Sequence, residues 1–231
     1  MLRSEGDRIS CEFERAPPRD IGPRAECRAA LGPVPEVEPL ADFLVSLCAK
    51  HGARLLLIDG PQAWKHEANG LPCQRVCEKE LATQAKTGPP GLVKPGTQTS
   101  FVAFSVRLFD ELETRGFARF EPARPAERLA LEIWPTACWR ALGARPLPGK
   151  AKASDADIGS RARLLADRFG MSFGAEPNHD ELQAAVAGLA GIALEGHPAL
   201  AWEARGRAPF QLGGAWREGV IVLPVPAKSS R

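Results

Sequence analysis

Acidic side chains lie at the ends of apolar segments, or within them, at three places in this 231-residue chain. Asp59 follows a run of four aliphatic residues, Glu132 interrupts a second apolar run, and Asp180 or Glu181 opens a late helical segment. Carboxylates brought together repel one another unless a cation binds, so such a cluster favours a hard metal such as Mg²⁺ or Mn²⁺. Two such ions activate a water molecule and stabilise the leaving oxygen in phosphodiester cleavage. The candidate chemistry is therefore metal-dependent hydrolysis.

Each of these acids also has an ordinary structural interpretation. The two residues after Asp59 are a glycine and a proline, which are common in turns. An acid within a strand is rarely buried without a partner, so Glu132 pairs either with a metal or with an arginine such as Arg75 or Arg140. Asp180 is a potential helix cap. The spacing alone leaves open whether the three acids converge.

Basic and aromatic side chains near these acids are candidates for substrate binding. Arg75 lies three residues before Glu78 on a predicted helix, where the two would form an exposed ion pair worth about 0.2–0.5 kcal/mol. Alternatively, Arg75 binds an anion at the site. Lys150 and Lys152 either contact phosphate or remain solvated in a loop. Trp64 either stacks on a base or packs in the core.

Several familiar site motifs are absent from the sequence. It contains no Gly-x-x-x-x-Gly-Lys-Ser/Thr loop and no Gly-x-Gly-x-x-Gly fingerprint. It also has no tyrosine and only four histidines. These absences argue against a P-loop nucleotide hydrolase, a Rossmann dehydrogenase and acid–base chemistry through histidine.

The elements that must position these residues follow from the hydrophobic periodicity. Leu55 to Ile58 have no polar alternation, which is typical of a strand covered on both faces, and this strand ends at Asp59. A helical pattern from Val37 to Lys50 precedes it, with Gly52 as the C-terminal stop, and a helix feeding a strand is typical of α/β folds. The same criteria predict strands at 7–15, 128–135 and 218–224, helices at 73–81, 101–115, 136–142, 158–169 and 179–195, and a long loop at 86–100. Asn178 or Asp180 is expected to cap the last helix.

The length is enough for one sizeable globular domain or at most two small ones, and we expect a single domain over residues 1–231. Apolar residues make up 44% of the chain, and the net charge of +2 neither indicates nor excludes a nucleic-acid partner. No apolar run approaches the roughly 20 residues of a membrane span, and the first residues lack the apolar core of a signal peptide. We expect a cytoplasmic protein with reduced cysteines and no membrane partner, of open oligomeric state.

An ordered series of motifs is similar to a known family. The series is Leu57-Ile58-Asp59-Gly60-Pro61-Gln62-Ala63-Trp64, Arg75-Val76-Cys77-Glu78-Lys79-Glu80-Leu81, Glu132-Ile133-Trp134-Pro135-Thr136-Ala137-Cys138-Trp139-Arg140, His179-Asp180-Glu181-Leu182-Gln183-Ala184-Ala185 and Arg217-Glu218-Gly219-Val220-Ile221-Val222. It resembles an uncharacterised family of predicted nucleases, a domain of unknown function grouped with the ribonuclease-H-like proteins. In that family a strand-ending Asp-x-Pro, a Glu-x-x-Pro and a late helical acid recur in this order. The resemblance covers roughly residues 54 to 224.

The resemblance implies an α/β, ribonuclease-H-like fold, a mixed sheet flanked by helices, with Asp59 and Glu132 as metal ligands. At the helical position the family usually has two acids three residues apart followed by alanine. Gln183 takes the second of these places, which leaves Asp180 as the ligand. Ribonuclease-H-like enzymes usually begin with a strand that carries Gly-x-Asp. Nothing before Asp7 resembles that strand, so we expect the first strand to be missing or atypical.

Two functions are consistent with these observations. The first is a nuclease, a hydrolase that cleaves nucleic-acid phosphodiester bonds with Mg²⁺ or Mn²⁺. Its expected metal ligands and catalytic residues are Asp59, Glu132 and Asp180, and its expected substrate-binding residues are Arg75, Lys150, Lys152 and Trp64. The second is a catalytically inactive ribonuclease-H-like module that binds nucleic acid or a protein partner, which the missing Gly-x-Asp favours.

Overall fold

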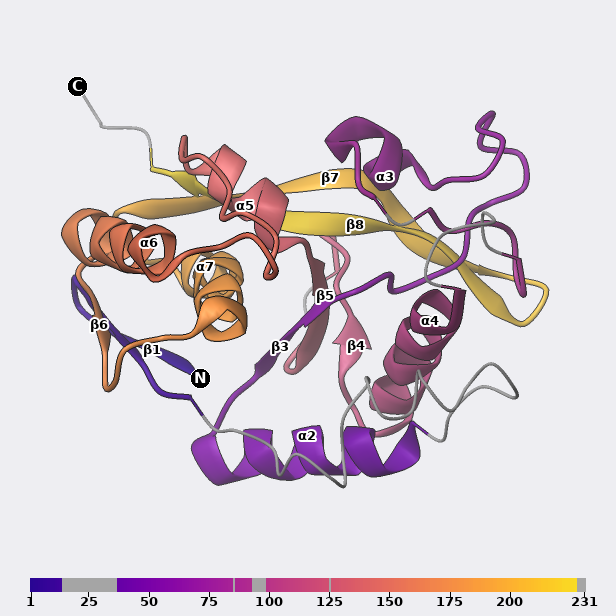
Figure 1. The fold of residues 1–231 in the computed structure, drawn as a ribbon. Coiled ribbons are helices and arrows are strands. Elements are labelled where there is room, and N and C mark those ends of the chain that lie inside the picture. The colour runs from indigo at the N-terminus through magenta and orange to yellow at the C-terminus, as the bar shows by residue number, and fades with distance from the viewer. Residues whose placement is uncertain (14–36, 85, 93–98, 125, 228–231) are drawn as a thin grey trace. The chain divides into compact units, whose positions relative to one another are not determined.

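The computed structural model describes residues 1–13, 37–84, 86–92, 99–124 and 126–227. The helices and strands in this part of the chain are shown in Figure 1. They are, in order, β1 (Leu2–Glu5), β2 (Arg8–Cys11), α2 (Glu38–His51), β3 (Leu55–Asp59), α3 (Val76–Leu81), α4 (Thr99–Thr114), β4 (Ala118–Arg119), β5 (Leu129–Ile133), α5 (Pro135–Ala141), α6 (Asp155–Phe169), β6 (Met171–Phe173), α7 (His179–Leu194), β7 (Leu200–Leu212) and β8 (Ala215–Pro226).

Contacts between residues divide the chain into two compact units, which are described separately. Unit 1 consists of Met1–Glu14, Ile133–Glu203 and Val222–Arg231. Unit 2 consists of Arg15–Glu132 and Ala204–Ile221. The long strands β7 and β8 each begin in one unit and end in the other. The expectation of one domain over residues 1–231 stays a prediction.

Unit 2 is built on the strands that carry Asp59 and Glu132. β3 and β5 are neighbours in a sheet of order β3-β5-β8-β7, and β4 is a further partner of β5. β5 pairs in parallel with β4, and also with β8, where Glu132 lies opposite Ile221. Glu132 therefore lies on an inner strand of the sheet, and it is buried.

Two helices cover β3 in unit 2. α2 and α4 contact each other, and buried residues such as Phe109 and Leu112 join them in one apolar core. Leu56 and Ile58 of β3 pack against this core but are only partly buried, so the predicted covering of both faces of the strand is incomplete. Gly52 adopts the left-handed conformation with φ 63° and ends α2, as predicted.

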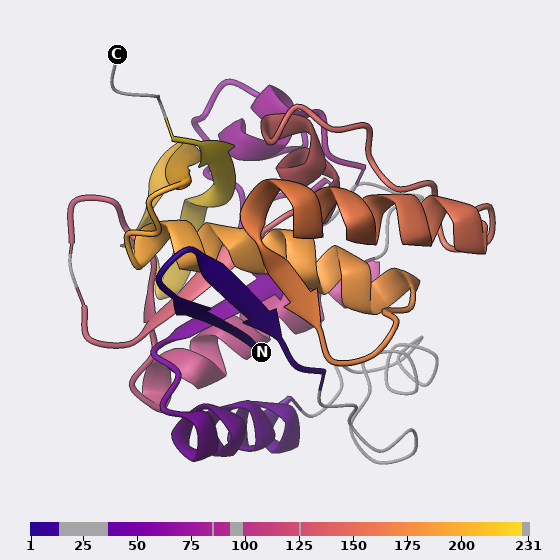
Figure 2. The ribbon, with the colours of Figure 1, turned by 90° about the vertical axis from the view of Figure 1, so that its left-hand side faces the viewer.

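Unit 1 contains a second, three-stranded sheet of order β1-β2-β6. β1 and β2 are antiparallel, β2 and β6 are parallel, and the burial of Ile9 and Cys11 confirms the alternation predicted for this strand. α7 contacts α5, α6 and β1 (Figure 2). Leu2 of β1 packs closely over Gly188 of α7, where a Cβ would lie 2.4 Å from Cδ1 of Leu2. Asn178, one of the two predicted caps, accepts hydrogen bonds from the first turn of α7.

The observed elements confirm a mixed α/β protein in which helices flank sheets of parallel and antiparallel strands. α2, β3, α4, β5, α5, α6, α7 and β8 lie where the periodicity predicted them, to within a few residues. The predicted helix at 73–81 is shorter, beginning at Val76. Residues 14–15 of the predicted first strand and residues 93–98 of the 86–100 segment lie outside the described residues. Within the described part of that segment, residues 86–92 form no helix, whereas α4 begins at Thr99.

The strands that the sequence did not predict are β1, β4, β6 and β7. β7 is the clearest case, because its 13 residues are mostly exposed and include polar, glycine and proline positions without a period-two apolar pattern. None of the described helices is long and apolar enough to cross a membrane. The five cysteines in the described part of the chain are free, as expected for reduced thiols.

Candidate functional site

Asp59 is the last residue of β3, where the strand passes into a tight turn. The amide of Gly60 donates to the carbonyl of Ile58 at 3.0 Å. The Asp59 residue is exposed, yet the protein packed around its carboxyl group limits hydration and raises its pKa to about 6. The negative charge of Glu132 adds to this rise. Asp59 is thus a solvent-accessible carboxylate that changes charge close to neutral pH.

Gln62 anchors the turn that follows Asp59. Its backbone amide donates to Oε2 of Glu132 at 2.9 Å, and its side-chain amide donates to the carbonyl of Val220 at 2.8 Å. Its own carbonyl accepts from Nε of Arg119 at 3.0 Å. Gln62 is fully buried, so these bonds do not compete with bulk water. Three elements therefore hold the turn in place.

Glu132 and Arg75 form a buried, two-pronged ion pair. Nη1 of Arg75 donates to Oε2 of Glu132 at 2.7 Å, and Nη2 donates to Oε1 at 2.6 Å. The two side chains are 1% and 4% exposed. Burial raises the pKa of Glu132, and the charge and hydrogen bonds of Arg75 oppose that rise without cancelling it. The arginine partner that the sequence left as an alternative to a metal is therefore present.

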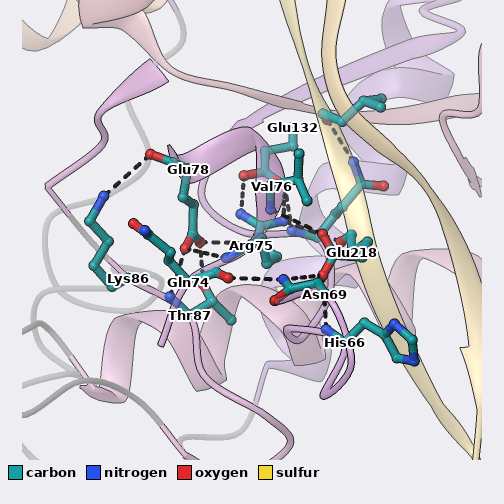
Figure 3. A network of polar contacts seen from close by, with 12 residues as sticks. His66, Asn69, Gln74, Arg75, Val76, Glu78, Lys86, Thr87, Glu132 and Glu218 are labelled. Atoms are coloured by element: carbon teal, nitrogen blue, oxygen red, sulfur yellow. Dashed lines mark hydrogen bonds and ion pairs between the residues drawn. The ribbon is translucent and has the colours of Figure 1, made fainter. Parts of the chain in front are cut away.

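The guanidinium of Arg75 also binds Glu78, the third residue of α3. Nε of Arg75 donates to Oε1 of Glu78 at 2.9 Å, and the Arg75 amide donates to Oε2 at 3.0 Å. Glu78 further accepts from the amide of Thr87 at 2.9 Å and from its hydroxyl at 2.6 Å. Figure 3 shows these carboxylates converging on Arg75. The prediction of an exposed Arg75–Glu78 pair is wrong, because β5, β8 and the segment at Thr87 enclose it.

A third buried acid, Glu218 of β8, completes this group. Oε1 accepts from the amide of His66 at 2.9 Å and from Nδ2 of Asn69 at 2.7 Å, and Oε2 accepts from the amide of Val76 at 3.1 Å. Val76 begins α3, so the carboxylate lies at the positive end of that helix. We call Arg75, Glu78, Glu132 and Glu218 the Arg75 network (Figure 3).

Arg119 is a second buried arginine in unit 2. It forms ion pairs with Asp110 and Glu113, and its guanidinium lies 4.8 Å from the centre of the Trp216 ring. Because Arg119 also donates to the carbonyl of Gln62, the Asp59 turn is bonded directly to Arg119 and through Glu132 to Arg75.

Asp180 lies in unit 1, at the start of α7. It forms an ion pair with Lys150, and its Oδ1 lies 3.1 Å from Nδ1 of His179. Partial burial raises the pKa of Asp180, but its bonds to Lys150 and His179 outweigh this and leave the pKa lowered. The convergence of Asp180 with Asp59 and Glu132 stays a prediction, as does phosphate binding by Lys150 and the exposed Lys152.

Trp64 is half-buried in unit 2, where its amide donates to the carbonyl of Trp216 at 3.0 Å. Its role in base stacking stays a prediction. Gln183 takes the place of the second helical acid, and its Oε1 accepts from Nε1 of the buried Trp139 at 2.8 Å. In unit 1 this position therefore anchors the tryptophan of α5 instead of supplying a charge.

Metal binding by Asp59, Glu132 and Asp180 stays a prediction. Across the described residues, no three side chains among histidines, cysteines, aspartates and glutamates are arranged to hold a metal ion. The charge of Glu132 is already balanced by Arg75, and both of its oxygens accept hydrogen bonds. Asp59 combines exposure with a pKa raised to about 6. Asp110 is also exposed and also has a raised pKa, but it is bound to Arg119, so Asp59 is the stronger candidate for a reacting group.

Sequence reasoning singled out Asp59, Glu132 and Arg75 but missed Glu218 and the burial of Glu78. Glu218, like Glu132, is an acid beside a run of apolar residues, and this pattern could have identified it. Its backbone adopts φ 61°, an unusual conformation for a residue other than glycine, and Gly219 follows at φ 124°. Neither this backbone conformation nor the burial of Glu78 is visible in a period-two or period-3.6 pattern.

A family model described as "Protein of unknown function (DUF429)" matches residues 24–197. No curated protein and no solved structure matches the chain. The matched range contains Asp59, Arg75, Glu132 and Asp180 and ends before Glu218.

Proposed function

The chain belongs to the DUF429 family of proteins of unknown function, and from this premise we propose that it is a ribonuclease-H-like phosphodiester hydrolase acting on nucleic acid. The observation that carries the proposal is Asp59, an exposed carboxylate of pKa about 6 at the end of a sheet strand. The order of the strand-ending acid, the second strand acid and the late acidic helix supports it, since the same order occurs in the predicted nucleases that the sequence resembles.

Asp59 has the properties of a general base for hydrolysis. An efficient base has a pKa near the working pH, and Asp59 is mostly ionised above pH 6. The carboxylate accepts a proton from a water molecule as the water oxygen bonds to phosphorus. The phosphorus–oxygen bond to the leaving strand then breaks, and the leaving oxygen takes a proton from solvent. The rigid turn holds Asp59 in one position during these events.

Mg²⁺ and Mn²⁺ are each added to the cleavage assay, and no step of the reaction above depends on them. No group of three or more potential metal ligands is found among the described residues, and Glu132 is paired with Arg75. Activity with each ion, and with a chelator, decides whether a metal takes part.

The proposal is tested by cleavage of labelled single- and double-stranded DNA and RNA by the wild type and by Asp59→Asn. We expect the variant to lose about 100-fold or more of the rate, the usual contribution of a general base. Asp42→Asn is the matched control, because Asp42 of α2 is also an exposed carboxylate but pairs with Arg115. Equal rates for the wild type and Asp59→Asn, with either ion or with chelator, would overturn the proposal.

A second function, a non-catalytic module that binds nucleic acid or a protein partner, is favoured by one observation. Glu132, expected as a metal ligand, is instead part of a buried ion pair. This function predicts nucleic-acid binding that persists in chelator, without turnover. Cleavage that Asp59→Asn abolishes selects the first function, and binding without cleavage by the wild type selects the second.

A further inference from the structure

Glu132 contacts both the buried guanidinium of Arg75 and the turn that carries Asp59. We infer that Glu132 is a positioning residue, which through its ion pair with Arg75 fixes the turn from Asp59 to Gln62, and that it does not bind a metal or substrate. This inference assigns a role that differs from the one expected from the sequence.

The first support is the geometry of the turn. Gln62 lies three residues after Asp59, and its backbone amide donates to Oε2 of Glu132. The same oxygen accepts from Nη1 of Arg75, so the guanidinium, the carboxylate and the amide lie in one hydrogen-bonded chain. Gly60, between these residues, has no room for a side chain, since a Cβ would lie 2.4 Å from Oγ of Ser105. The turn therefore has little freedom to move while Glu132 is in place.

The second support is that Arg75 is itself held from the other side. Glu78 binds Nε of Arg75 and is in turn bound twice by Thr87. Arg75 thus faces Glu132 in a fixed orientation, which suits a planar guanidinium that pairs with a carboxylate through two parallel bonds.

The third support is the free-energy cost that metal binding by Glu132 would carry. To coordinate a metal with both oxygens, Glu132 would have to release Arg75 and the Gln62 amide. Arg75 is 1% exposed, and a buried charge without its partner is strongly destabilising. The ion pair is therefore more consistent with a permanent support for the turn than with a ligand that exchanges between partners.

The positioning role can be tested without any activity assay, although its catalytic meaning rests on the proposed function. The experiment is amide hydrogen exchange by NMR on the full chain, for the wild type, Glu132→Gln and Glu78→Gln. The two substitutions each remove one negative charge from the same network. Glu132 accepts from the Gln62 amide, whereas Glu78 accepts from the Thr87 amide.

We expect each substitution to speed exchange mainly at the amide that its own carboxylate accepts from. Glu132→Gln speeds exchange of the Gln62 amide by about tenfold or more, the loss of one hydrogen bond to a charged group, and changes Thr87 less. Glu78→Gln does the reverse. The titration of the Asp59 carboxyl, followed by ¹³C NMR in the same samples, moves to lower pH in Glu132→Gln and stays in place in Glu78→Gln, because Glu132 is the charge that acts on Asp59.

Unchanged exchange at Gln62 and an unchanged Asp59 titration in Glu132→Gln would overturn the inference. If that variant does not fold, Glu132→Asp serves instead. It keeps the charge but withdraws the carboxylate by one methylene, so the Gln62 amide should exchange faster while the Asp59 titration stays raised, and slow exchange at Gln62 would contradict the inference. Because no readout depends on cleavage, an inactive protein with the expected exchange pattern would refute the proposed function alone.

Discussion

At the scale of the residue, Asp59 and Glu132 show how surroundings decide what a carboxylate does. Both are near apolar strands in the sequence, and both have a raised pKa. Glu132 is enclosed and paired with Arg75, whereas Asp59 is exposed and is repelled by Glu132. The first arrangement supports structure, and the second leaves a group able to exchange protons with a ligand or solvent.

Asp59→Asn should stabilise the protein at neutral pH. The folded pKa of about 6 lies well above the ordinary value of an aspartate carboxyl, so ionisation of Asp59 opposes folding, fully above pH 6 and not at all below about pH 4. The variant should therefore melt at a higher temperature than the wild type at pH 8, and the difference should shrink as the pH falls from 6 to 4. Thermal melts at several pH values check this, and a variant less stable than the wild type at pH 8 would contradict it.

Removing one partner of the buried ion pair should cost far more than removing both. Arg75→Met leaves Glu132 and Glu78 buried without their cation and should lower the free energy of unfolding by about 3–5 kcal/mol. Glu132→Met should then cost less in the Arg75→Met background than in the wild type, by about 1 kcal/mol or more. Urea unfolding of the two single variants and the double variant measures this coupling. Additive costs would show that the two side chains do not stabilise each other.

At the scale of the element, the Arg75 network depends on a close approach of α3 to the β7–β8 pair. Gly206 of β7 has φ 111°, and a Cβ there would lie 2.6 Å from the carbonyl oxygen of Gly219 and 2.7 Å from Cβ of Cys77. This contact brings the start of α3 next to Glu218, which accepts from the Val76 amide. The position of α3 is therefore set by a glycine in a strand that no sequence pattern identified.

Gly206→Ala should destabilise the fold by about 1–3 kcal/mol, because backbone strain and a clash with main-chain atoms coincide. Gly159→Ala is the matched control. Gly159 lies in α6, and a Cβ there meets nothing within 4 Å, so this change should raise stability by about 0.5–1 kcal/mol. Chemical denaturation of both variants provides the comparison, and a neutral Gly206→Ala would mean that α3 can move away from β7.

Helices and strands with a strong apolar pattern could be predicted from the sequence. Strands that are held mainly by backbone pairing could not. α2, α4 and α7 carry apolar residues at helical spacing, and β3 and β5 are nearly continuous apolar runs. β7 is mostly exposed and is held by pairing with β8, which leaves little trace in residue type. For the same reason Asp59 and Glu132 were found from their strands, whereas the convergence of Glu78 and Glu218 on Arg75 depends on tertiary contacts.

At the scale of the whole molecule, the net charge of +2 gives little general attraction for nucleic acid, so binding must come from local cations. Lys152 is exposed in unit 1, near Lys150, which pairs with Asp180. These lysines lie in the segment between α5 and α6.

Binding of a single-stranded oligonucleotide should weaken as salt rises, and Lys152→Gln should reduce the slope of log affinity against log salt by about 0.7 for a lost phosphate contact. Arg8→Gln, which removes an exposed cation from β2, should leave the slope unchanged. Fluorescence anisotropy over a salt series measures both slopes. Equal slopes in all three proteins would show that Lys152 makes no contact with a phosphate of the bound oligonucleotide.

The central claim, that Asp59 is the reacting carboxylate of a phosphodiester hydrolase, is tested most directly by the pH dependence of cleavage. The wild-type rate should rise with pH and level off with a midpoint near 6, matching the Asp59 titration measured by NMR in the same buffer. In Glu132→Gln both midpoints should move to lower pH together. A rate that stays flat from pH 5 to 7, or a midpoint that does not follow the Asp59 titration, would contradict the claim.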